Sequence, residues 1–133
     1  MIYALDTNII SYLLKDDEKV YSRYCEALAK GDFCVIPLVV YYEVLRGLEA
    51  NNAINKLHLF ENLCDELDII ELTIADAVTA ARIYSINKHR GTPVDDADLL
   101  IAAQVITHEY TLITNNIKHF SGIDDLVYDD WTA

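Results

Sequence analysis

Short apolar runs alternate along the chain with longer segments in which apolar residues recur at helical spacing. Short runs of this kind are typical of buried strands, and helical spacing is typical of helices that bury one face. The pattern predicts strands at 2–5, 33–36, 68–71, 111–114 and 126–128, and helices at 9–14, 20–28, 40–48, 54–64, 74–84 and 95–109. Strands separated by helices require a parallel sheet with right-handed connections. We therefore expect an α/β fold: a three-layer α/β/α sandwich around a parallel sheet of four to five strands, as a single domain over residues 1–133.

Individual residues mark where several of these elements begin or end. Gly31 is placed to end the second helix, and Pro37 stops the second strand and can begin the helix after it. Asn52 is a candidate cap for the helix at 54–64. Thr73 and Asp76 have the spacing of a capping box, in which each side chain accepts a hydrogen bond from the backbone N–H of the other residue.

The composition excludes several classes of protein. With 53% hydrophobic and 24% charged residues, the chain of 133 residues is not disordered. No apolar run approaches the roughly 18 residues that suggest a membrane span. The N-terminus has no basic region and carries a carboxylate at Asp6, so it does not resemble a signal peptide. The three cysteines (Cys25, Cys34 and Cys64) lack a C-x-x-C spacing, which argues against a disulfide framework or a zinc site and favours a reducing cytoplasm.

The net charge of −12, from 22 acidic residues against 10 Lys and Arg, is strongly negative. Such a surface repels nucleic acid at long range, and the chain shows no basic cluster. Two explanations are open at this point. The acids form a solvated surface that keeps the protein soluble, or some of them gather into a cluster that binds a divalent metal.

Acidic and amide side chains recur where the predicted strands end or where the next helix begins. Asp6 follows the first predicted strand, and Glu43 lies in the helix after the second strand. The other members are Asp95, Asp96 and Asp98 in the first turn of the helix that precedes the fourth strand, and Asn115 and Asn116 directly after that strand. Because ligands of open parallel sheets bind at the carboxyl ends of the strands, we expect these side chains to converge. Mg²⁺ and Mn²⁺ prefer carboxylate oxygens and water, and such metals activate water for phosphodiester displacement.

Each of these residues also has an explanation without catalysis. Asp6 can cap the next helix, and Glu43 can pair with Arg46 three residues later. The acids at 95–98 suit the positive end of a helix dipole, although three of them in one turn repel one another. The amides at 115–116 can form a turn. Only convergence of the four segments would favour the catalytic interpretation.

Four motifs in order resemble the PIN-domain family, and within it the VapC-like toxin ribonucleases of type II toxin–antitoxin pairs. The motifs are Leu5-Asp6-Thr7-Asn8-Ile9, Tyr42-Glu43-Val44-Leu45-Arg46-Gly47, the segment from Pro93 to Ala103, and Leu112-Ile113-Thr114-Asn115-Asn116 with Phe120 and Trp131. The resemblance extends from about Met1 to Trp131, nearly the whole chain. It implies a metal-dependent endoribonuclease that cleaves RNA phosphodiester bonds with Mg²⁺ or Mn²⁺ as cofactor.

The resemblance also implies roles for individual residues. Asp6, Glu43 and Asp98 match the family's catalytic metal ligands. Many members carry a fourth acid where this chain has Asn116, so Asn116 and the neighbouring Asp96 are additional candidate ligands. Residues expected to orient the ligands are Thr7, Asn8 and Asn115.

The implied partners are an RNA substrate, a small antitoxin that blocks the site, and a second copy of the chain in a homodimer. Candidate RNA-contacting residues are Arg46, Lys88, His89, Arg90 and Lys118; each of them can equally be an ordinary solvated base. The four histidines are far apart in sequence and lack an H-x-x-x-H pair, so we assign none of them to the metal.

Two other functions are compatible with parts of the sequence. A catalytically weak or inactive PIN-like module would hold a small partner protein without cutting RNA, and Asn116 together with the acidity makes this conceivable. A phosphatase of the Asp-x-Asp-x-Thr type would need an acid where the chain has Asn8, and the acceptor pattern of a receiver domain is absent.

Overall fold

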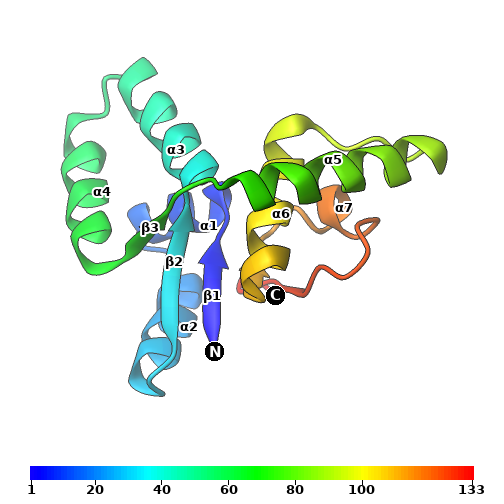
Figure 1. Cartoon of the computed structure of the whole chain (residues 1–133). Coiled ribbons are helices and arrows are strands. Elements are labelled where there is room, and N and C mark those ends of the chain that lie inside the picture. The colour runs from blue at the N-terminus through cyan, green and yellow to red at the C-terminus, as the bar shows by residue number, and fades with distance from the viewer.

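A computed structural model describes all 133 residues, and Figure 1 shows the path of the chain. The strands are β1 (Ile2–Leu5), β2 (Phe33–Pro37), β3 (Asp68–Ile70), β4 (Thr111–Ile113) and β5 (Tyr128–Asp129). The helices are α1 (Thr7–Leu14), α2 (Glu18–Ala29), α3 (Leu38–Ala50), α4 (Ile54–Glu66), α5 (Ile74–His89), α6 (Asp96–His108) and α7 (Ile117–Phe120).

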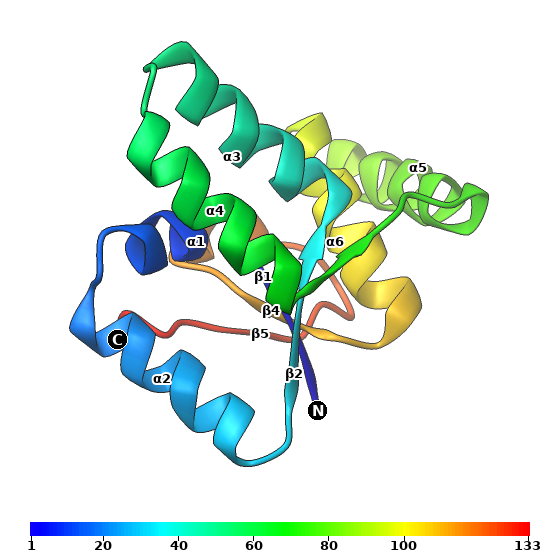
Figure 2. The same ribbon diagram turned by 90° about the vertical axis from the view of Figure 1, so that its left-hand side faces the viewer.

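All five strands run parallel in one sheet, in the order β3-β2-β1-β4-β5. The chain moves from β1 towards one edge through β2 and β3, and then crosses to β4 and β5 on the other side of β1. Because crossovers between parallel strands are almost always right-handed, such a reversal is expected to place helices on opposite faces of the sheet. Figure 1 shows α3 and α4 on one side and α5, α6 and α7 on the other, and in Figure 2 α4 lies in front of the strands. The three-layer sandwich with a parallel sheet is therefore confirmed.

Several of the predicted local signals are present. Gly31 follows the end of α2 with a φ of 85°, the left-handed conformation that suits a helix terminus. Pro37 is the residue from which α3 begins, and Thr73 and Asp76 form the complete capping box of α5. The prediction for Asn52 is wrong: its φ is 50°, and Ala53 takes the cap position of α4. Asn52 thus serves a left-handed turn, a conformation that asparagine tolerates.

Some element bounds differ from the prediction. The fifth strand begins at Tyr128 rather than at 126, and α7 was not anticipated. A helix of four residues is too short to show an apolar period. α7 matters for function because it follows β4 at the carboxyl edge of the sheet.

The sheet and the helices enclose a core of 29 buried hydrophobic residues. Its fully buried members include Leu5, Ile36 and Ile113, which lie at or near the carboxyl ends of the three central strands. This rigid base fixes the position of the polar residues that follow each strand. None of the helices combines the length and the apolar composition that crossing a bilayer requires. All three cysteines are free.

Candidate functional site

A polar cavity of about 290 Å³ lies at the carboxyl edge of the sheet, and no hydrophobic side chain lines it. Its walls come from four parts of the chain: the β1–α1 junction, α3, the first turn of α6, and the segment after β4 that includes α7. The lining residues are Asp6, Thr7, Asn8, Ser11, Glu43, Asp98, Asn116 and His119. Convergence of the four segments, on which the catalytic interpretation depends, is thus present in the fold.

Asp6 lies directly after β1 and is only 4% exposed. One carboxylate oxygen accepts a hydrogen bond from the backbone N–H of Thr7 at 2.8 Å, and the other accepts one from the Thr114 hydroxyl at 2.7 Å. Burial raises the pKa of Asp6 above its ordinary value; the two hydrogen bonds lower it, and the negative charge of Glu43 raises it. Asp6 does cap α1, as the simpler explanation held. Because each oxygen still has a free lone pair, capping does not exclude a ligand role.

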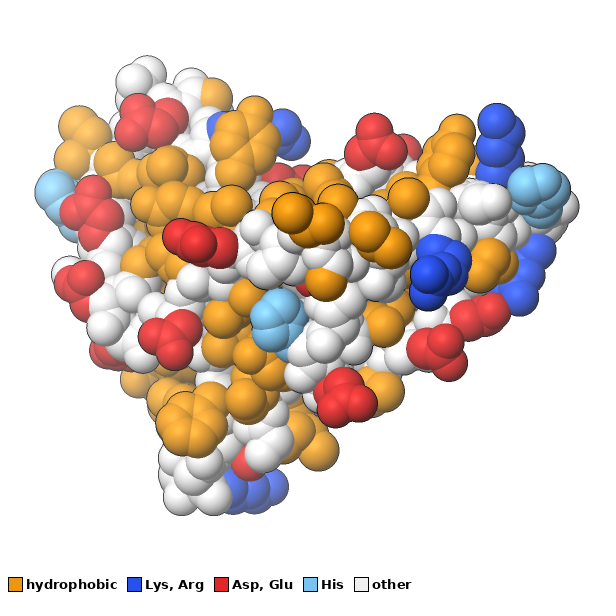
Figure 3. All heavy atoms as spheres, viewed as in Figure 1, with side chains coloured by type: hydrophobic (Ala, Val, Ile, Leu, Met, Phe, Trp, Pro, Cys, Tyr) orange, Lys and Arg blue, Asp and Glu red, His pale blue; other side chains and the backbone are white.

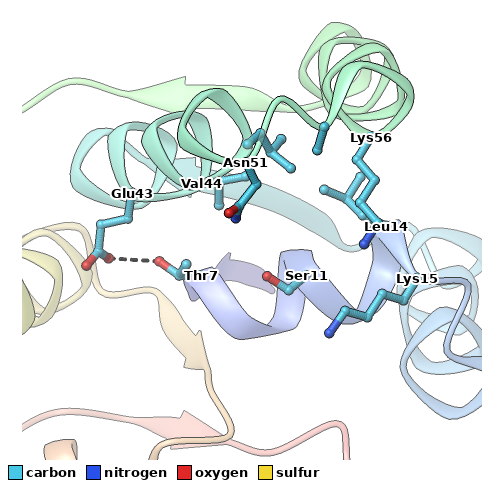
Figure 4. A pocket seen from close by; sticks show the side chains of 11 residues that line it. Thr7, Ser11, Leu14, Lys15, Glu43, Val44, Asn51 and Lys56 are labelled. Carbon is cyan, nitrogen blue, oxygen red and sulfur yellow. Dashed lines mark hydrogen bonds between the residues drawn. The ribbon is translucent and has the colours of Figure 1, made fainter.

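Glu43 approaches the cavity from α3 and is half-buried. Its Oε1 accepts a hydrogen bond from the Thr7 hydroxyl at 2.8 Å, drawn as the dashed line in Figure 4. Thr7 therefore connects the first and second motifs and fixes the Glu43 carboxylate. Glu43 does not pair with Arg46, because the guanidinium of Arg46 lies over the Tyr42 ring, 5.2 Å from its centre.

Asp98 occupies the third position of α6 and has a side chain that is 18% exposed. Its Oδ2 lies 3.2 Å from Nδ1 of His119. Burial is the main reason why the pKa of Asp98 is raised; proximity to His119 lowers it, while the charges of Asp6 and Glu43 raise it. The carboxylates of three separate elements therefore repel one another across this cavity.

The donor set of the cavity suits a hard divalent cation. Three carboxylates face it without any Lys or Arg among the lining residues, and only His119 offers partial neutralisation. Asn8 also lines the cavity, and its Oδ1 is buried with no hydrogen-bond partner, so an amide oxygen remains unused. No three His, Cys, Asp or Glu side chains lie close enough to hold an ion without adjustment. Mg²⁺ commonly binds proteins through one or two carboxylates and keeps several waters.

The structure places two of the predicted site residues elsewhere. Asp96 lines a separate hollow between α5 and α6. Residues two positions apart on a helix point in different directions, so Asp96 diverges from Asp98. The side-chain amide of Asn115 donates to the Thr132 hydroxyl at 3.1 Å, so Asn115 holds the C-terminal segment instead of a carboxylate. Thr7, Asn8 and Asn116 do line the cavity, as expected.

None of the bases proposed to contact RNA lines this cavity. Arg90 is occupied by two hydrogen bonds to the Asp124 carboxylate, at 3.0 and 2.8 Å. Lys88 lies over the Tyr84 ring, and Nδ1 of His89 lies 2.7 Å from the Ser85 carbonyl oxygen. Lys118 is exposed on α7, next to the cavity residue His119.

Sequence reasoning missed three residues that belong to the site. Thr114 is fully buried. Its hydroxyl donates a hydrogen bond to Asp6 and accepts one from the backbone N–H of Asn116 at 3.0 Å. His119 faces Asp98, and Ser11 lies one helical turn after Thr7. His119 lies three residues after Asn116, a spacing that would place both residues on the same side of a helix. Without a predicted helix at this point, that spacing gave no indication that His119 faces the site.

Comparisons with known proteins identify the family to which this fold belongs. The family model described as "PIN domain" matches residues 3–126, and the chain belongs to this family. Ribonuclease VapC1 of Haemophilus influenzae is 31% identical over 133 residues, 99% of each chain. Ribonuclease VapC2 of Rickettsia felis is 32% identical over 137 residues, 98% of each chain. A solved structure of VapBC-1 from nontypeable Haemophilus influenzae superposes with a TM-score of 0.87 at 30% identity, covering 100% of both chains.

Replacing Thr114 with valine tests how the Asp6 carboxylate is held. The variant keeps the shape of the side chain and removes a hydrogen bond to a buried carboxylate. We expect a loss of about 1–3 kcal/mol in the free energy of unfolding, measured by urea denaturation. Thr111→Val is the matched control, because Thr111 begins β4, the strand that Thr114 directly follows, and its hydroxyl makes no hydrogen bond. Equal stability of the two variants would show that the Thr114 hydroxyl does not support Asp6.

Proposed function

We propose that this protein is a divalent-metal-dependent endoribonuclease and the toxin of a toxin–antitoxin pair. The observation that carries the proposal is the gathering of Asp6, Glu43 and Asp98, from three separate elements, around one cavity with a wholly polar lining. Membership of the PIN-domain family and likeness to VapC ribonucleases along nearly the full chain support it.

Asp6, Glu43 and Asp98 are the proposed metal ligands, with Asn116 at the margin of the same cavity. When bound, a divalent cation supplies a Lewis acid that neutralises the carboxylates, binds substrate phosphate and lowers the pKa of water. Mg²⁺ is our first choice and Mn²⁺ the second, because the cavity offers oxygen ligands only, apart from His119.

The chain's other polar groups orient these ligands. The Thr7 hydroxyl holds Glu43, and the Thr7 amide and the Thr114 hydroxyl hold the two oxygens of Asp6. Such outer contacts fix the direction of the free lone pairs and raise metal affinity. His119 lies on Asp98 and shields one side of its carboxylate.

The proposed partner is a small antitoxin protein, and relatives with this fold have been solved as VapBC complexes. A net charge of −12 suits a partner with basic side chains, which could occupy the carboxylate cavity. We place the protein in a reducing cytoplasm, a proposal supported by its three free cysteines.

Asp98→Asn and Asp96→Asn form a matched pair that tests the metal site and the activity together. For the wild type and for Asp96→Asn, we expect Mn²⁺ at one hundred times its Kd to raise the free energy of unfolding by about 2.7 kcal/mol. We also expect both proteins to cleave RNA. Asp98→Asn should lose the stabilisation, and its cleavage should fall at least about a hundredfold, because a ligand that touches the metal is removed. The measurements are thermal denaturation and gel analysis of total RNA.

Full cleavage by Asp98→Asn would contradict the assignment of this residue. Absence of cleavage by the wild type with any divalent metal, together with tight binding of a small partner protein, would instead favour the inactive binding module.

The exposed face of α5 supports the proposed homodimer. Ile74, Val78 and Tyr84 on this helix are 85%, 53% and 46% exposed, and Ile74 and Val78 lie one helical turn apart. Beside them is a hollow of about 500 Å³ lined by Ala80, Ala81, Leu99 and Leu100 among others. Figure 3 shows the hydrophobic side chains along this helix. Exposed apolar side chains beside an apolar hollow are typical of an interaction surface.

Val78→Asp should convert the dimer into a monomer, because a charge would be buried at the proposed interface. The molar mass from light scattering at micromolar concentration measures this. Ile54→Asp is the control, since Ile54 is 65% exposed on α4. A wild-type monomer, or a dimer that persists in Val78→Asp, would contradict the proposal.

A further inference from the structure

A second cavity, of about 310 Å³, lies between α1, α3 and the start of α4 and continues from the carboxylate cavity. The two cavities share Thr7, Ser11 and Glu43 as lining residues, so they adjoin each other, and together they are called the groove. Figure 4 shows Glu43 and Thr7 at one end of the second cavity and Lys15 and Lys56 at the other. A linear ligand seated at the carboxylates can therefore extend along α1 into this second cavity.

Two ammonium groups gather at the far end. Lys15 follows the last residue of α1, and Lys56 comes from the first turn of α4, so two separate helices supply them. Neither lysine forms a salt bridge, although the chain has 22 acidic residues. Between the lysines and Glu43 lie the hydroxyl of Ser11 and the amide of Asn51, which are further hydrogen-bond donors.

Lys56 lies in the first turn of α4, where a basic side chain is electrostatically unfavourable. The first turn of a helix carries a partial positive charge and favours acids, yet α4 has no acid there and no side-chain cap. A lysine at this position costs a little stability, and an anion bound in the cavity would offset this cost. Lys15, at the opposite end of its helix, is placed favourably for the helix dipole.

We propose that Lys15 and Lys56 bind a backbone phosphate of the RNA, at a position beyond the phosphate that is cleaved. This inference rests on the proposed ribonuclease function and adds a substrate-positioning site to it. A residue rises 1.5 Å along a helix, so Lys15 begins roughly 12 Å along α1 from Thr7, too far to share the phosphate held near Glu43. Because lysine acts as a point charge, the site recognises the backbone and not the base sequence.

An RNA backbone fits this groove better than an acidic peptide does. The groove places cationic groups at one end and a candidate metal site at the other, and both are groups that bind phosphates. A backbone with regularly spaced phosphates can occupy both ends at once. It would also explain how a protein with a charge of −12 holds a polyanion, because the attraction is confined to one groove.

The test compares the double variant Lys15→Gln/Lys56→Gln with Lys30→Gln. Lys30 is exposed after the end of α2, near the amino ends of the strands and away from the groove. All proteins carry Asp98→Asn, so that a labelled single-stranded RNA of mixed sequence remains intact. Fluorescence anisotropy over a range of salt concentrations gives Kd and its salt dependence. Circular dichroism and urea denaturation verify that each variant is folded.

We expect the double variant to bind RNA about tenfold more weakly than the parent at low salt. The slope of log K against log salt should shrink by about 0.7, the contribution of one lost phosphate contact on a single strand. Lys30→Gln should change neither quantity. Unchanged affinity and slope in the double variant would overturn the proposal, and so would a loss of partner-protein binding without a loss of RNA binding.

Cleavage by proteins that retain Asp98 separates this inference from the proposed function. If the wild type cuts RNA and Lys15→Gln/Lys56→Gln cuts equally well at subsaturating RNA, the phosphate site is wrong and the ribonuclease stands. If the wild type never cuts but RNA binding still depends on the two lysines, the ribonuclease is wrong and the phosphate site stands.

Discussion

The burial of the Asp6 carboxylate at the end of β1 is the constraint on which the rest of the site depends. A charged group that is 4% exposed is costly unless it is fully hydrogen-bonded. The fold meets this requirement with the first amide of α1 and with the Thr114 hydroxyl from the end of β4. These two bonds join neighbouring parallel strands at the edge where the ligands converge. The third motif then contributes Asp98 from α6. The second motif contributes Glu43, which the hydrogen bond from the Thr7 hydroxyl holds in place.

In the folded protein, the carboxylates of Asp6, Glu43 and Asp98 repel one another. Burial and neighbouring negative charges raise the pKa of both Asp6 and Asp98, which means that the ionised cavity is unfavourable without a compensating cation. The hydrophobic core beneath the carboxyl ends of β1, β2 and β4 holds the acids in place. The adjoining cavity between α1, α3 and α4 carries two cationic groups, Lys15 and Lys56. Under the proposed function, one surface of an acidic protein would thus hold phosphate in two different ways.

Much of this could be predicted from the sequence because the signals were local. The apolar runs located the first four strands and placed the fifth two residues too early, and the strand ends identified Asp6 and the amides after β4. The first turn of the helix before β4 drew attention to its acids, and the resemblance to the PIN-domain motif singled out Asp98 among them. Asp96 was misplaced because adjacent acids in one turn look alike in sequence but point in different directions. Thr114 was missed because its partner Asp6 is 108 positions away, and His119 because α7 is too short to be detected. Such contacts depend on tertiary packing, which no local pattern encodes.

The central claim is that repelling carboxylates from separate elements are held together so that a divalent cation binds between them. Anomalous diffraction from crystals soaked in Mn²⁺ tests this claim most directly, because the manganese signal locates the ion without reference to activity. The account predicts one strong anomalous peak within coordinating distance of the Asp6 and Asp98 carboxylates, with Glu43 directed towards it. A peak elsewhere on the acidic surface, with none in this cavity, would contradict it.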